Sequence, residues 1–306
     1  MKVAVFSNNS TRFVGDLLDH WRAKGHEVKF EPGSNEFLAD ESDVVFVDQF
    51  DNNVYYLKER MKNKDKVKVY GRALDWDVWI GNLRDQNMVD WVDGVFCIAP
   101  HIEKRLRAEA NMEGKLHFIR LGVDLDKFTF KKEFGGFNIV MPVNEVDWYL
   151  KNTLMGLRIF HRLLKEHTAW KLFIKGHFKE PEYFQLIIKD YIEKAGLTKY
   201  VQIDEGWVDD YNAYLEPIDY CLLPSLKEGF SFVTAQCAAK GIKPILNWWY
   251  GAEGLWPEEW LFLDEGEAVT KVLEAADKNP FDYRAYIDRT YNFKRTAEEM
   301  DTVMGL

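Results

Sequence analysis

Short runs of β-branched and aromatic residues alternate along the chain with longer segments in which apolar residues recur every three to four positions. The first pattern is typical of buried strands and the second of amphipathic helices, so the alternation predicts parallel sheets joined by crossover helices. In the first half we expect strands at 3–7, 26–30, 43–50, 66–71, 94–99 and 116–120, and helices at 11–24, 53–63 and 101–110.

A polar stretch after Asp124, which contains Gly135 and Gly136, interrupts this pattern before it starts again. In the second half we expect strands at 138–143, 170–176, 200–204, 219–225, 243–248 and 261–264, and helices at 151–167, 180–196, 209–217, 231–240 and 265–277. The sequence therefore predicts two α/β domains, 1–128 and 137–280, with the boundary between residues 122 and 137. A length of 306 residues suits two domains of this size.

Composition narrows the classes of function. The formal net charge of -10 repels a phosphate backbone, which makes nucleic acid an unfavourable partner. The three cysteines, Cys97, Cys221 and Cys237, each lie in an apolar run without metal-ligand spacing, so we expect buried free thiols in a reducing compartment. No apolar run approaches the length of a transmembrane helix, and we expect a cytoplasmic protein.

The most informative segment is the turn at residues 224–232, Pro-Ser-Leu-Lys-Glu-Gly-Phe-Ser-Phe, between a predicted buried strand and a short apolar helix. Glu228 places a carboxylate at the mouth of this turn, and Gly229 lets a ligand approach the backbone. The following helix presents unpaired N–H groups that suit a diphosphate. A solvated glutamate in an ordinary turn is the alternative reading. No Gly-rich phosphate motif is present.

Residues 206–262 resemble the sugar-nucleotide half of the retaining glycosyltransferases of the GT-B fold, glycosyl transferases group 1. The shared motif is P-S-x-x-E-G-F, here Pro224 to Phe230, followed by a small-residue helix ending at Gly241 and a strand with Pro244. A second glutamate normally follows eight residues after the first, but this chain has Gln236. The resemblance implies two Rossmann-like doubly wound domains facing each other across a cleft, with the segment 281–306 crossing back onto the first.

The resemblance also implies roles for single residues. Glu228 would contact the donor sugar and Lys151 the leaving diphosphate, as the two catalytic residues. Gln236 would contact the ribose, or else be a core helix residue. The other implied donor-binding residues are Gly229, Phe230, Ser231, Lys175, Trp207 and Asn144, where Trp207 lies against the nucleobase or is a packed tryptophan, and Asn144 lies where relatives carry an arginine.

The first half resembles the family less. After the strand at 66–71 the chain has Arg72 and Asp75 where relatives commonly carry a histidine, and Asp75 either contacts a sugar or caps a helix. The pair Asn8 and Asn9 follows the first strand and can hydrogen-bond sugar hydroxyls without charge. We expect these four residues on the acceptor or sugar side.

The function implied is retaining hexosyl transfer from a nucleotide sugar, UDP-linked in preference to GDP-linked, to a glycan, lipid-linked sugar, protein or small molecule. No metal and no cofactor besides this donor is expected. Two alternatives stay open: a catalytically inactive nucleotide-sugar-binding or scaffold protein, because of Gln236 and the missing histidine, and a glycosyltransferase acting on modified DNA bases, against which the acidic charge counts.

Overall fold

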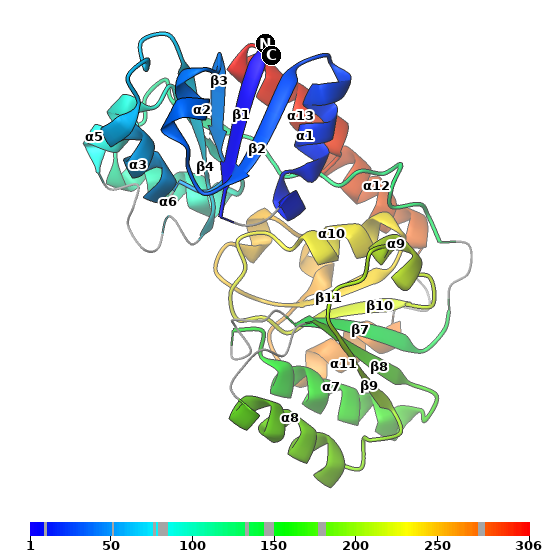
Figure 1. Cartoon of the computed structure of the whole chain (residues 1–306). Coiled ribbons are helices and arrows are strands. Elements are labelled where there is room, and N and C mark those ends of the chain that lie inside the picture. Colours follow the sequence, from blue (N-terminus) through cyan, green and yellow to red (C-terminus); the bar gives the residue numbers. More distant parts are fainter. Residues whose placement is uncertain are drawn as a thin grey trace. The chain divides into compact units, whose positions relative to one another are not determined.

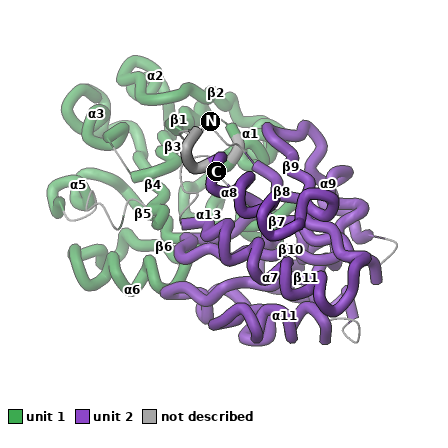
Figure 2. The backbone as a smooth tube through the Cα atoms, turned by 90° about the horizontal axis from the view of Figure 1, so that it is seen from below, with its two compact units in different colours: residues 1–124, 292–306 green, residues 125–291 purple. Residues whose placement is uncertain are grey.

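The computed structural model describes the chain except for residues 9–10, 51, 76–77, 79–84, 132–134, 144–149, 177–181 and 275–278. The chain divides into two compact units, shown in two colours in Figure 2. Unit 1 comprises Met1–Asp124 and Asn292–Leu306, and unit 2 comprises Leu125–Tyr291. Over the described residues, each unit is built on a six-stranded parallel sheet with helices on both faces. The predicted class, two doubly wound α/β domains, is confirmed.

The sheet of unit 1 has the strand order β2-β1-β3-β4-β5-β6. Its strands are β1 (Lys2–Ser7), β2 (Glu27–Pro32), β3 (Val44–Val47), β4 (Lys68–Ala73), β5 (Gly94–Cys97) and β6 (Leu116–Phe118). Its described helices are η1 (Thr11–Phe13), α1 (Gly15–Ala23), α2 (Glu36–Asp40), α3 (Asn52–Arg60), α5 (Gln86–Trp91), α6 (Pro100–Glu109) and α13 (Phe293–Met304).

Alternation along β1 directs Val3 and Val5 into a core that contains Trp21 of α1 and Met300 of α13. The two helices lie side by side on this face (Figure 1). The carboxylate of Asp301, on α13, accepts hydrogen bonds of 2.8 Å from the indole of Trp21 and the ammonium of Lys24. The last helix of the chain is thereby held in unit 1 by both apolar burial and a nearly buried charge.

The sheet of unit 2 has the order β12-β11-β10-β7-β8-β9. Its strands are β7 (Asn138–Val143), β8 (Lys171–Gly176), β9 (Val201–Glu205), β10 (Tyr220–Leu223), β11 (Lys243–Asn247) and β12 (Leu261–Phe262). Its described helices are α7 (Thr153–Glu166), α8 (Glu182–Lys194), α9 (Tyr211–Tyr214), α10 (Phe232–Ala239), η3 (Ala252–Gly254), η4 (Glu258–Trp260), α11 (Glu265–Leu273) and α12 (Pro280–Thr290).

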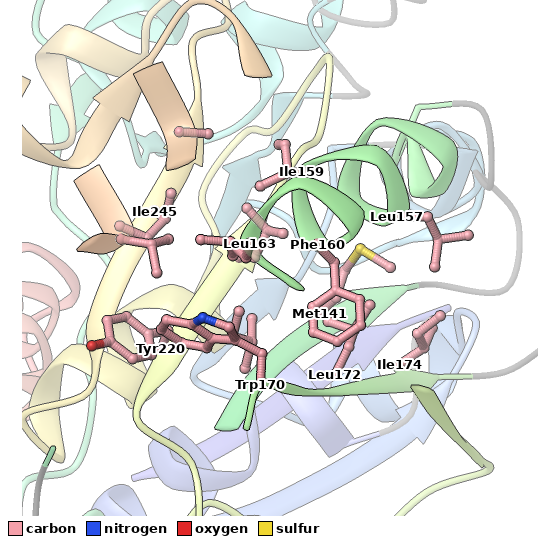
Figure 3. Packing of buried hydrophobic residues seen from close by; sticks show 14 of the residues in the cluster. Met141, Leu157, Ile159, Phe160, Leu163, Trp170, Leu172, Ile174, Tyr220 and Ile245 are labelled. Atoms are coloured by element: carbon pink, nitrogen blue, oxygen red, sulfur yellow. The ribbon is translucent and has the colours of Figure 1, made fainter. Parts of the chain in front are cut away.

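Alternate side chains of β7 pack into two different hydrophobic clusters in unit 2. Met141 points toward Phe160 of α7 and packs in the larger cluster (Figure 3), whereas Val140 lies in a second cluster with Cys221 and Cys237. A sheet covered on both faces needs apolar residues at successive positions, which explains the continuous apolar run of this strand. All three cysteines are buried and free, as expected.

The chain leaves unit 1 after Asp124, and a basic side chain fixes the next residues to unit 2. Arg284 of α12 donates to the carbonyl oxygens of Leu125 and Phe128 at 3.0 and 2.8 Å. The expected segment 281–306 is two helices, and only the second, α13, belongs to unit 1. The first, α12, belongs to unit 2.

Two short helices of unit 1 were not predicted. Helix α2 is fixed by Asn35, whose side chain accepts hydrogen bonds of 3.1 Å from the N–H groups of Phe37 and Leu38. Helix α5 is capped in the same way by Asp85. Both have six residues or fewer, too few for an apolar period to repeat, so capping chemistry was the one available signal.

Candidate functional site

The strand order of unit 2 reverses direction between β10 and β7, the first strand of its sheet. Ligands of doubly wound sheets bind outside the carboxyl ends of the strands at such a switch point. The loop after β10, residues 224–231, leads from this point into α10, and Leu150 lies just before α7. The predicted Asn144 lies outside the described residues.

The two segments at the switch point are joined directly. The N–H of Leu226 donates a 2.7 Å hydrogen bond to the carbonyl oxygen of Leu150. Gly156, in the first turn of α7, lies so close that an added Cβ would be 2.2 Å from the sulfur of Met141 and 3.2 Å from the ring of Pro224. The glycine lets α7 pack closely on Met141 of β7, and the first turn of α7 lies beside the segment that carries Glu228.

The two residues predicted to be catalytic lie together. The ammonium of Lys151 forms an ion pair with the carboxylate of Glu228, and the two side chains are 17% and 11% exposed. A pair with so little solvent around it is screened far less than a surface pair. The arrangement places a cation and an anion next to each other at the switch point of the sheet.

The turn after Glu228 is ordered by its own helix. Ser231 is buried and caps α10: its hydroxyl oxygen accepts hydrogen bonds from the N–H and the hydroxyl of Thr234 at 3.3 and 2.9 Å. Gly229 precedes it and is half-buried. The cap gives Ser231 a structural role, and its predicted contact with the donor stays a prediction.

Phe230 belongs to an aromatic cluster. Its ring stacks on Trp256 with centroids 5.5 Å apart and lies 5.0 Å from the ring of Tyr291. The hydroxyl of Tyr291 in turn donates to the carbonyl oxygen of Leu255 at 2.5 Å. Phe230 therefore anchors the loop of Glu228 to the buried aromatic residues behind it, and its side chain packs on protein.

Gln236 lies one turn into α10 and is half-buried, whereas the next three residues of the helix are completely buried. Gln236 is the fifth of the eight residues of α10, and it is not among the buried residues of that helix. Both readings of this residue, ribose contact and helix residue, agree with that position.

Lys175 and Trp207 lie at the carboxyl ends of the neighbouring strands. The ammonium of Lys175 donates to the carbonyl oxygen of Asp204 at 3.3 Å and lies 5.4 Å from the ring centroid of Tyr214. Only 8% of this lysine is exposed. Trp207 follows β9 and is 57% exposed, so it is not a core tryptophan.

In unit 1, Arg72 is part of a buried polar cluster that the sequence did not predict. Its guanidinium pairs with Asp48, directly after β3, and also donates to the carbonyl oxygen of Phe13 at 3.1 Å. Ser7, at the end of β1, donates to the same carboxylate at 3.2 Å. Arg72 is 3% and Asp48 0% exposed. The buried cluster therefore holds the carboxyl ends of β1, β3 and β4 together, which is a structural role.

Gln49, beside Asp48, has a strained backbone with φ of 120°, which few residues other than glycine adopt. Phe50 follows it and is completely buried against Gly71, where an added Cβ would be 2.4 Å from the ring. Gln49 is thus fixed between two anchored residues. The apolar run at 43–50 predicted a continuing strand and gave no signal of this turn.

The other residues expected on the acceptor side are less defined. Asn8 follows β1 and is exposed, and Asp75 lies just after β4 and is half-buried. Asn9 lies outside the described residues. In the part of the chain that the structure describes, no group of three His, Cys, Asp or Glu residues could hold a metal ion. No helix within the same part is long and apolar enough to span a bilayer.

Comparison with solved structures identifies the fold as GT-B. Sucrose-phosphate synthase from Thermosynechococcus elongatus superposes with a TM-score of 0.76 at 14% identity, covering 99% of this chain and 98% of the other. HepE from Anabaena in complex with UDP gives 0.76 at 14% identity, with both chains fully covered. An α-glucosyltransferase in complex with UDP gives 0.70 at 13%, again over both full chains.

Comparisons by sequence find no relative. No family model matches the chain, and no curated protein matches it. These three structures are each less than 15% identical to this chain, so the likeness establishes the fold alone. What the chain does must be argued from its own residues.

Proposed function

We propose that this protein is a retaining glycosyltransferase that takes a hexose from a nucleotide sugar, with UDP preferred to GDP. The observation that carries the proposal is the pair of Lys151 and Glu228 at the switch point of unit 2. Support comes from the GT-B architecture and from UDP in the structures of HepE and the α-glucosyltransferase. The acceptor is a glycan, a lipid-linked sugar, a protein or a small molecule.

In this proposal some site residues would bind the sugar and others would stabilise the leaving group. Breaking the bond between the anomeric carbon and the diphosphate moves negative charge onto the phosphate oxygens, where the ammonium of Lys151 and the amino-terminal N–H groups of α10 would stabilise it. Glu228 would accept hydrogen bonds from hydroxyl groups of the donor sugar. In the free protein the same carboxylate holds Lys151 in place.

Retention would follow from front-face chemistry. The bond from the anomeric carbon to the leaving phosphate breaks first, and the acceptor oxygen forms its new bond on the same face. The departing phosphate takes the proton of that hydroxyl, so no protein nucleophile is required. We expect neither a metal ion nor a further cofactor in this step.

A thermal-shift series with UDP, GDP, ADP, dTDP and their sugars tests the donor assignment. A ligand present at about 100 times its dissociation constant stabilises the folded state by about 2.7 kcal/mol. We expect a UDP-sugar to stabilise the wild type most and Glu228→Ala to lose the sugar-dependent part. Glu193→Ala, an exposed glutamate of α8, is the matched control. No shift with any nucleotide would overturn the proposal.

A non-catalytic nucleotide-sugar binder is the second candidate, and Gln236 in place of the second glutamate favours it. An amide gives the ribose hydroxyls a neutral contact where a carboxylate would give a charged one. Release of UDP from a stabilising UDP-sugar separates the two functions. Slow release by the wild type that Glu228→Ala abolishes supports the enzyme, and binding without any release supports the binder.

A further inference from the structure

Two large aromatic residues at the carboxyl end of β11 face solvent. Trp248 is 40% and Tyr250 57% exposed, whereas Trp249 between them is 2% exposed. Two exposed leucines lie on adjacent segments, Leu226 at 53% and Leu263 at 73%. We refer to Trp248 and Tyr250, flanked by these leucines, as the aromatic platform. Large exposed apolar side chains on neighbouring segments are a common feature of binding sites.

Backbone hydrogen bonds fix the platform in place. The N–H of Trp248 donates to the carbonyl oxygen of Phe262 at 2.8 Å, which places Trp248 next to Leu263. The N–H of Ala252 donates to the carbonyl oxygen of Trp249 at 2.9 Å and closes the turn that carries Tyr250. The aromatic rings therefore extend from an ordered turn. Ligand binding does not have to order that backbone, so it avoids the corresponding loss of conformational entropy.

The platform is linked to the proposed catalytic loop. The side-chain amide of Asn247, the residue before Trp248, donates a 2.9 Å hydrogen bond to the carbonyl oxygen of Ser225. Ser225 lies three residues before Glu228 on the same loop. The platform and the Lys151–Glu228 pair thus lie at the carboxyl ends of neighbouring strands of one sheet.

The charges around the platform select the kind of ligand. Residues 248–270 contain six acidic side chains and no lysine or arginine. Arg158 and Arg162 pair with Glu265, Lys271 pairs with Glu267, and Lys227 follows Leu226. Four acidic side chains of this stretch therefore have no such partner among these bases, and acids remain in excess. An excess of acidic side chains disfavours nucleic acid and anionic lipid as partners of this surface. It favours a neutral molecule whose hydroxyl groups donate to carboxylates.

We propose that Trp248 and Tyr250 stack on a pyranose ring of a neutral glycan acceptor. The inference rests on the proposed function and specifies its acceptor. A pyranose has an apolar C–H face that covers an aromatic ring and hydroxyl groups at its edge, so it matches both the rings and the acidic surround. The acceptor hydroxyl would reach the catalytic loop along the carboxyl edge of the unit 2 sheet.

Saturation-transfer NMR with neutral trisaccharides of glucose, mannose and N-acetylglucosamine tests the platform on the full chain. We expect at least one trisaccharide to bind the wild type, and the double variant Trp248→Ala/Tyr250→Ala to bind it about tenfold more weakly. Trp248→Phe/Tyr250→Phe, which keeps an aromatic ring at each position, should bind within about threefold of the wild type. Leu186→Ala, an exposed residue of α8, is the control.

Thermal shifts with UDP on the same variants separate this inference from the proposed function. Unchanged UDP binding together with lost trisaccharide binding supports the platform. If UDP stabilises the wild type but no trisaccharide binds at millimolar concentration, or the alanine variant binds as well as the wild type, the platform proposal fails and the donor site stands. Loss of UDP binding in the alanine variant, or dimers of the wild type that the variant abolishes, also overturns it.

Discussion

Lys151 and Glu228 neutralise each other at the point where the strand order of unit 2 reverses. The two residues are 77 positions apart in the chain, and the hydrogen bond from Leu226 to Leu150 joins the segments that carry them. Because each is the other's partner, removing either one leaves a largely buried charge unpaired.

The pair should behave as one unit in catalysis. Lys151→Met and Glu228→Gln are each expected to slow release of UDP from the UDP-sugar that stabilises the wild type by about 10²- to 10³-fold, because charge stabilisation in the transition state is lost. The double variant should be little slower than the worse single variant. Initial rates of UDP release measure this.

The exposed pair Lys194 and Asp190 on α8 is the matched control, since the same kinds of substitution there remove a solvated ion pair. Lys194→Met and Asp190→Asn should leave the rate unchanged. Additive losses for Lys151 and Glu228 would show that the two residues act independently.

Gln236→Glu should tighten UDP binding. A carboxylate accepts charge-assisted hydrogen bonds from both ribose hydroxyls, which are about twice as strong as those to an amide. We expect a decrease in the dissociation constant of about three- to tenfold, measured by titration calorimetry. Gln236→Ala should weaken binding by removing the contact. If neither change alters UDP binding, Gln236 is a helix residue without a ribose contact.

Gln49→Gly should stabilise unit 1. Glycine adopts a φ of 120° readily, and the strain of a non-glycine residue in such a conformation costs about 1 to 3 kcal/mol, partly offset by the larger entropy of an unfolded glycine. We expect a net gain of about 1 kcal/mol in the free energy of urea unfolding. Gln49→Ala removes the side chain but keeps the strain, so it should give no comparable gain.

Asp301 should make unit 1 stability depend on pH. Burial raises the pKa of its carboxyl, but hydrogen bonds from His20, Lys24 and Trp21 outweigh this and lower it overall. A carboxyl with a lower pKa in the folded state stabilises the fold above its unfolded pKa, and this contribution is lost as the pH falls through the folded pKa. The stabilisation is therefore complete at neutral pH and disappears in acid.

Asp301→Asn should accordingly lower the free energy of unfolding at pH 7 by about 2 kcal/mol. The difference from the wild type should shrink as the pH is lowered below 4, because the wild-type carboxyl then also becomes neutral. Urea unfolding over this pH range measures it, with Asp282→Asn on the exposed side of α12 as control. If the difference in the free energy of unfolding between wild type and Asp301→Asn does not change with pH, the charge of Asp301 is not the cause, and the effect comes from the shape of its side chain.

The sequence predicted the fold well because the spacing of apolar residues depends on which side chains are buried. Continuous apolar runs indicated strands covered on both faces, and a repeat of three to four residues indicated the helices that cover them. Strand β7 was placed at its observed bounds, 138–143. Glu228 and Lys151, which the resemblance assigned to one donor site, form an ion pair, and their roles toward a donor stay a prediction. Periodicity could not show where a buried strand ends in a polar turn. Asp48 and Gln49 were therefore read as strand, although Asp48 neutralises Arg72.

Local motifs also could not separate side chains that face a ligand from those that hold the loop. Ser231 and Phe230 lie in the same turn as Glu228, but the first caps α10 and the second stacks on Trp256. Exposure separated Trp248 and Tyr250 from the buried aromatic residues nearby. That distinction depends on three-dimensional packing, which the sequence pattern does not contain.

The contribution of residues 292–306 to unit 1 affects the order in which the protein can fold during synthesis. Unit 2 is one continuous stretch, 125–291, whereas the core of unit 1 includes Ala297, Met300 and Met304 of α13. A ribosome delivers these residues only after all of unit 2 has been made. Although unit 1 is translated first, the part of its core that α13 covers stays exposed until the end of synthesis. Unit 2 can therefore complete its core before unit 1 does.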